Sequence, residues 1–173
     1  MKFMGHAIHP MLIVFPLGLL ATSLGFDAAY LTTSNPEFAI VAFWMISAGI
    51  IGALLAAVFG AIDWWGIPSK TRAKAIGLWH GSVNVVIVLL FIGSWLMRRN
   101  VPGYTPTAAA VTLSCVGIAL AVVGGWLGAE LVERLGIAVD DGAHPNAPNS
   151  LSGRPASEQA HNTGSPMPRP RSI

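Results

Sequence analysis

Two histidines stand within long apolar stretches of this chain, where titratable side chains are uncommon. His9 opens the segment HPMLIVFPLGLL, and His80 lies in LWHGSVNVVIVLL. An imidazole can carry a proton near neutral pH, donate or accept a hydrogen bond, or bind a metal through one ring nitrogen. His9 and His80 are therefore the first candidates for chemistry.

Three further polar residues could act with these histidines. Asp27 closes the first apolar stretch, Asp63 closes the second, and Asn84 follows His80 by one helical turn. A carboxylate or an amide can orient an imidazole or shift its titration. Asp63, Asn84 and Asp27 are accordingly the candidate members of a polar cluster.

The elements that carry these residues are too apolar for a soluble domain. The 173 residues are 53% hydrophobic and 10% charged, with a mean hydropathy of +0.61. An α-helix needs about 20 apolar residues to cross roughly 30 Å of hydrocarbon. Four stretches meet that length and are predicted as transmembrane helices: residues 10–31, 38–62, 75–97 and 108–131.

Short connections join the four predicted spans. They favour an all-α fold in which an antiparallel up-down four-helix bundle occupies residues 1–139. From residue 140 the composition changes to Pro, Ser, Asn and Gly. Such a segment buries too little apolar surface to offset its ordering entropy, so residues 140–173 are predicted to be a disordered tail.

Helical spacing collects the polar residues on single faces. Positions 9, 13, 16, 20, 23 and 27 form one stripe of the first span, and positions 77, 80, 84, 87, 91 and 94 form one of the third. The predicted topology brings His9, Asp63, His80 and Glu130 into one half of the membrane, and leaves Asp27 alone at the opposite end. Glu130 and Glu133 are expected to pair with Arg134 at the surface.

Prolines and small residues predict local geometry. Pro10 disfavours the α conformation at the residue before it, so His9 is expected just before the first helix. Pro16 is expected to kink that helix. Small residues at a spacing of four mark close helix contacts in lipid. Two such lines occur: Ala48, Gly52, Ala56 and Gly60 in the second span, and Gly117, Ala121 and Gly125 in the fourth.

The basic residues near the span ends are unequally distributed. Lys2, Lys70, Arg72, Lys74 and Arg134 fall on one side, and Arg98 and Arg99 fall on the other. The positive-inside rule then predicts that both termini are cytoplasmic. The formal net charge of +2 comes from these loops and the tail, so no nucleic-acid partner is expected.

Four motifs occur in order along the chain: HPMLIVFPLGLLATSLGFD, GAIDWWGIP, LWHGSVN and GGWLGAELVERLGIAVDD. Together they resemble a bacterial family of predicted membrane proteins, domain of unknown function 2231. The resemblance covers about residues 6–141 and implies a four-helix protein of the bacterial inner membrane. It also implies motif positions in this chain: His9, Pro10, Pro16, Asp27, Gly60, Asp63, His80 and residues 125–132. Relatives often carry a histidine where this chain reads Glu133 to Gly136, and some are joined to iron–sulfur or cytochrome-like domains.

Three functions remain open at this point. The first is an accessory or scaffold subunit whose polar cluster is structural. The second is a redox-associated subunit in which His80 and His9 ligate a haem b between helices. The third is a proton or ion transporter that uses Asp27, His80 and Asp63, although no inverted repeat is evident. The expected partners are the lipid bilayer and redox or other membrane proteins, and no enzyme activity of the chain alone is expected.

Overall fold

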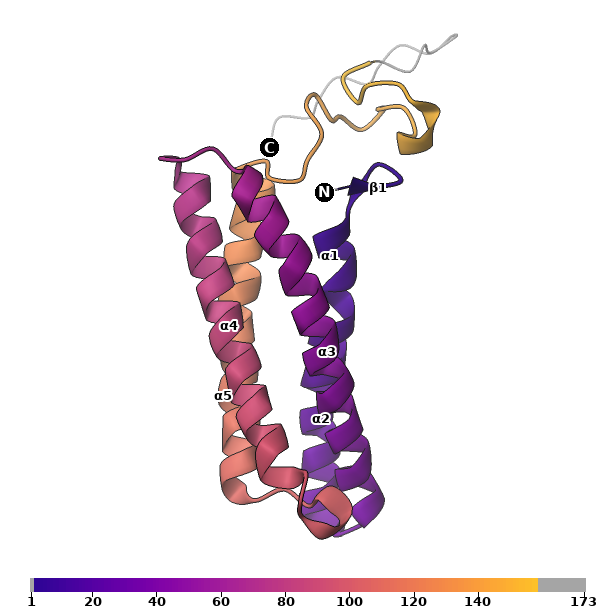
Figure 1. The fold of residues 1–173 in the computed structure, drawn as a ribbon. Coiled ribbons are helices and arrows are strands. Elements are labelled where there is room, and N and C mark those ends of the chain that lie inside the picture. Colours follow the sequence, from indigo (N-terminus) through magenta and orange to yellow (C-terminus); the bar gives the residue numbers. More distant parts are fainter. Residues whose placement is uncertain (1, 159–173) are drawn as a thin grey trace, which may run out of the picture.

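Four long helical stretches dominate the computed structural model, which describes residues 2–158 of the chain (Figure 1). The first stretch is divided in two, α1 and α2, and the others are continuous. Consecutive stretches are joined at alternating ends of the molecule (Figure 1). The helices are α1 Ile8–Leu12, α2 Val14–Thr33, α3 Pro36–Gly66, α4 Arg72–Arg98 and α5 Ala108–Ala129.

The remaining elements are short. Before α1, β1 Lys2–Phe3 and β2 His6–Ala7 pair as a small antiparallel ribbon. A 3-10 turn η1, Pro102–Tyr104, lies between α4 and α5, and a π-helical turn η2, Glu130–Arg134, continues α5. The tail contributes turns and one 3-10 turn, η3 Ser150–Ser152, as far as residue 158. The disorder predicted for 159–173 falls outside the described residues.

Side-chain caps explain where three helices begin. Asn35 accepts a hydrogen bond from the amide of Glu37, with Pro36 in the first turn of α3. Thr71 and Thr107 accept bonds from backbone amides at the starts of α4 and α5. Each of these bonds satisfies a backbone donor that has no partner within its helix.

The first helical stretch is interrupted at Ile13, three residues before Pro16. Pro16 has no amide hydrogen to donate to the carbonyl of Leu12, so the break lies where a proline kink is expected. The prediction that His9 precedes the helix is wrong. The helix begins at Ile8, and Pro10 is accommodated in its first turn, where the amide that proline lacks would have no helical partner in any case.

The helices form two hairpins. Hairpin I consists of α1, α2 and α3, and hairpin II of α4 and α5; within each, the helices pack along most of their length, whereas contacts between the hairpins are fewer (Figure 1). The core that joins the hairpins is formed by Leu20, Ile46, Ile87 and Phe91.

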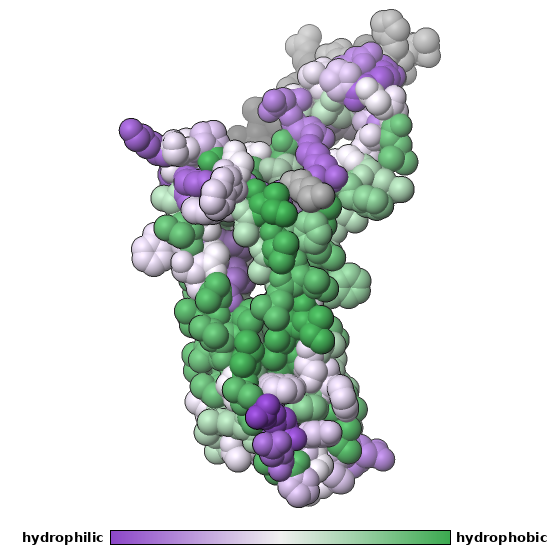
Figure 2. Space-filling view, viewed as in Figure 1, coloured by the Kyte–Doolittle hydropathy of each residue, from purple (hydrophilic) through white to green (hydrophobic). Residues whose placement is uncertain are grey.

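The outer surface of the hairpins is apolar. Four helical segments are long and apolar enough to cross a membrane: Ile8–Thr33, Pro36–Gly66, Arg72–Arg98 and Ala108–Arg134. Figure 2 shows apolar side chains over the middle of one face and hydrophilic side chains mainly toward its two ends. Such a surface is suited to lipid, because exposed apolar residues of this extent have no place in water.

Candidate functional site

His9 is held by the helix that packs against it. Its Nδ1 lies 2.8 Å from the carbonyl oxygen of Ala56 on α3. Gly60 lies one turn further along α3, and a Cβ atom there would approach the His9 ring to 2.9 Å. The absence of a side chain at Gly60 therefore makes room for the imidazole.

His80 is held in the same way in hairpin II. Its Nδ1 lies 2.9 Å from the carbonyl oxygen of Gly124 on α5, and a Cβ atom at Gly128 would approach its ring to 3.2 Å. The amide of Asn84 donates to the His80 carbonyl at 2.8 Å, and its nitrogen lies 3.4 and 3.5 Å from the two ring nitrogens. Asn84 thus packs against the imidazole from its own helix.

The two imidazoles meet between the hairpins. Their ring centroids are 6.2 Å apart and their planes are perpendicular. Because a carbonyl oxygen can only accept, each Nδ1 is the protonated nitrogen of its ring. In the neutral imidazole this leaves the lone pair of Nε2 as the ligating position. His9 and His80 are therefore two neighbouring imidazoles, each fixed through Nδ1 by a backbone carbonyl.

Burial varies along the inward stripes of the two hairpins. Pro16 and Ile87 are buried, and the inward stripes remain buried from these residues to Asp27 in α2 and to Arg98 in α4. His9, His80 and Asn84 are only half-buried. Beyond His80, Gly77 and Ala73 of α4 are buried again. We call the end of the bundle with His9 and His80 the histidine end, and the opposite end, where Asp27 and Arg98 form a salt bridge, the ion-pair end.

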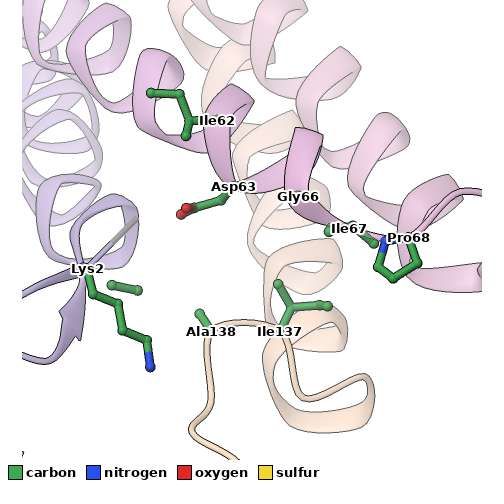
Figure 3. A pocket seen from close by; sticks show the side chains of 9 residues that line it. Lys2, Ile62, Asp63, Gly66, Ile67, Pro68, Ile137 and Ala138 are labelled. Carbon is green, nitrogen blue, oxygen red and sulfur yellow. The ribbon is translucent and has the colours of Figure 1, made fainter.

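Asp63 belongs to the histidine end but lines its own pocket. The pocket has a volume of about 310 Å³ and lies between the start of the chain, the end of α3 and the segment that follows η2. In Figure 3 the Asp63 carboxylate extends into this space on the side of Lys2. The structure thus places Asp63 one helical turn beyond Gly60, at the margin of the histidine pair. The residues that line the pocket are Lys2, Ala7, Ile62, Asp63, Gly66, Ile67, Pro68, Ile137 and Ala138.

Asp27 lies at the ion-pair end, and the expectation that it is alone there is wrong. Arg98 donates to both of its carboxylate oxygens, at 2.5 and 2.7 Å, and both side chains are almost fully buried. Ser94 accepts from Arg98 and donates to the carbonyl of Ala110, and Ser114 donates to Ser94. Arg98 resembles a loop charge in the sequence because it is the last residue of its helix.

Other expectations also need correction. Glu130 pairs with Arg72 of α4 at 2.6 Å, rather than with Arg134, because η2 brings it against the start of α4. A Cβ atom at Gly125 would meet no atom within 4 Å, so this glycine faces away from the other helices. Its neighbour Gly124 contacts Asn84 instead, and Gly117 contacts Phe91.

Comparison with known protein families gives a match over most of the chain. The family described as "Predicted membrane protein", domain of unknown function 2231, matches residues 5–141. The chain belongs to this family. The match spans all four apolar helices and agrees with the lipid-facing surface that they present. No curated protein and no solved structure matches the chain.

Proposed function

We propose that this member of the family is a haem-b-binding electron-transfer subunit of the bacterial inner membrane, in which His9 and His80 would hold the haem iron. The observation that carries the proposal is the paired geometry of the imidazoles. Each ring is fixed through Nδ1 by a backbone carbonyl, and the two rings approach each other from separate hairpins at 6.2 Å.

The separation of the rings fits a single metal centre between them. A metal–nitrogen bond of about 2.0 Å on each side separates the centroids of two opposed imidazoles by about 6 Å. The observed 6.2 Å is close to that value.

The number of donors favours haem over a bare metal ion. Among the described residues no group of three or more His, Cys, Asp or Glu side chains is placed to hold a metal. A haem iron has four nitrogen ligands from the porphyrin and needs at most two ligands from the protein. Two histidines from facing helices of a bundle meet that requirement.

The surrounding groups would tune such a site. A haem held by two histidines supplies one-electron transfer. The bonds from Nδ1 to the carbonyls of Ala56 and Gly124 fix the tautomer and increase the basicity of Nε2. The accessory role predicted from the sequence is compatible with this function, since an electron-transfer subunit serves a partner.

The absorption spectrum of the full-length protein tests the proposal. The protein is produced with added haem precursor, purified in detergent, oxidised and then reduced with dithionite. We expect a Soret band that sharpens and shifts on reduction, at about one haem per chain. Its absence from the wild-type protein would overturn the proposal.

Matched variants assign the ligands. His9→Ala and His80→Ala should each remove most of the bound haem, because alanine cannot ligate iron. His6→Ala is the control, because His6 is exposed and its ring lies against the carbonyl of Met4, outside the pair. Circular dichroism confirms that the variants keep their helices. Full haem content in folded His9→Ala or His80→Ala would contradict the assignment.

A further inference from the structure

The two hairpins share part of their pattern of burial. In α2 and α4 the repeat has an offset of 71 residues: the buried positions Pro16, Leu20, Ser23 and Asp27 correspond to Ile87, Phe91, Ser94 and Arg98. The same offset relates His9 to His80. Each set follows the spacing of one inward helical face, so the two hairpins present corresponding faces.

The second helices of the hairpins repeat with an offset of 68 residues. Ala42, Ile46, Gly49 and Ala56 of α3 are buried, and so are their equivalents Ala110, Ser114, Gly117 and Gly124 of α5. The contacts repeat as well. Gly49 lies against Leu20 and Gly117 against Phe91, which are themselves equivalent positions.

Equivalent positions also meet each other across the two hairpins. His9 contacts His80 at one end of the bundle, and Asp27 binds Arg98 at the other. In a two-fold arrangement, a residue meets its own counterpart only at the axis. The hairpins are therefore related by an approximate two-fold axis that passes through both pairs, along the length of the bundle.

The charges at the second pair distinguish the two hairpins. If both hairpins carried Asp at this position, or both carried Arg, two like charges would be buried against each other. One buried polar or charged contact can select a single pairing among similar helices, and like charges exclude the wrong ones. Asp27 and Arg98 are almost fully buried, so water screens their charges little.

We propose that the inward face of each hairpin is an interaction surface whose partner is the other hairpin, and that Asp27 and Arg98 make this recognition specific. The chain is then a tandem pair of similar units that associate through this face, and the short connection between α3 and α4 is not needed to keep them together. The proposal does not depend on haem binding.

The repeat also predicts that the two charges can be exchanged. Arg98 donates to Ser94, four residues before it. Ser23 stands four residues before position 27 and at present bonds only within its own helix, to the carbonyl of Leu20. In Asp27→Arg, the new guanidinium would therefore have Ser23 as a hydrogen-bond acceptor, four residues before it, as Arg98 has Ser94.

A cleavable full-length protein tests this. A protease site is inserted between Ser69 and Lys70, which are exposed in the connection between α3 and α4. The intact chain, with an affinity tag at its C-terminus, is purified in detergent, cleaved and recaptured. We expect hairpin I to remain bound to tagged hairpin II. Separation of the wild-type halves would overturn the proposal.

Charge variants of the same protein complete the test. Arg98→Asp and Asp27→Arg should each lower the retained fraction of hairpin I by about tenfold or more, and the double variant should restore it. Arg99→Asp is the control, because Arg99 is exposed and lies over Trp95. Wild-type retention in either single variant, or no recovery in the double variant, would refute the role of the charges.

Discussion

His9 and His80 owe their orientation to backbone atoms of a neighbouring helix. A carbonyl oxygen holds each Nδ1, and a glycine one turn further leaves space for each ring. A backbone acceptor cannot rotate away, so it fixes the tautomer more strictly than a mobile side chain would. The site therefore depends on glycines as much as on histidines.

Alanine at these glycines should disturb the site. At Gly60 the added Cβ would lie 2.9 Å from Cε1 of His9 and 3.0 Å from its Nδ1. We expect Gly60→Ala to lower the free energy of unfolding by about 1–3 kcal/mol through overpacking, and to reduce haem content several-fold. Thermal unfolding in detergent and the haem-to-protein ratio measure these effects.

Gly125→Ala is the matched control for this prediction. Its Cβ would meet nothing within 4 Å, and alanine has the higher helix propensity. It should leave haem content unchanged and stability unchanged or slightly raised. Equal behaviour of Gly60→Ala and Gly125→Ala would show that Gly60 makes no room for His9.

Sequence reasoning predicts the inward face of the first span and misses the ion pair. Spacing alone places Pro16, Leu20, Ser23 and Asp27 on one inward face, and all four are buried. The partner of Asp27 is missed because a terminal arginine has the same sequence signature as a membrane-interface charge. The equal spacing from His9 to Asp27 and from His80 to Arg98 is the signal that could have found it.

The helices follow from composition and caps, whereas their contacts depend on which way each side chain faces. The line Gly117, Ala121 and Gly125 is predicted to pack, but the structure turns Gly125 outward and Gly124 inward. Adjacent residues differ by about 100° around a helix, and composition does not distinguish the two glycines. The break at Ile13, in contrast, is predictable because proline acts on the backbone of its own helix.

Leucine substitutions compare two helix positions. A Cβ atom at Gly52 of α3 would lie 3.3 Å from Pro16, so Gly52→Leu should push α2 away from α3 and cost about 1–3 kcal/mol. Gly125→Leu should change stability by less than about 0.5 kcal/mol, because it faces outward. The measurement is thermal or denaturant unfolding in detergent. A larger loss for Gly125→Leu would contradict the placement of α5.

The whole molecule has one end where the hairpins are closed by an ion pair and one where two histidines face each other. The ion pair also bears on orientation, since Arg98 is neutralised inside the bundle and only Arg99 remains as a free basic residue at that end of α4. This strengthens the charge asymmetry that predicts cytoplasmic termini.

Single cysteines test that orientation. In a Cys115→Ser background, a membrane-impermeant thiol reagent applied to intact cells should label Thr33→Cys and not Thr71→Cys. Both positions are exposed, one at the end of α2 and the other just before α4. Labelling of position 71 alone would reverse the proposed orientation and place the histidine end on the outer side.

The central claim, that His9 and His80 jointly hold a haem, is tested most directly by electron paramagnetic resonance of the oxidised full-length protein. If both rings held the iron at their observed perpendicular orientation, two iron d orbitals would be close in energy, which would spread the g values of a low-spin ferric haem. We predict a strongly anisotropic low-spin signal that disappears in His80→Ala. No low-spin haem signal in the wild-type protein, or one that persists unchanged in His80→Ala, would contradict the account.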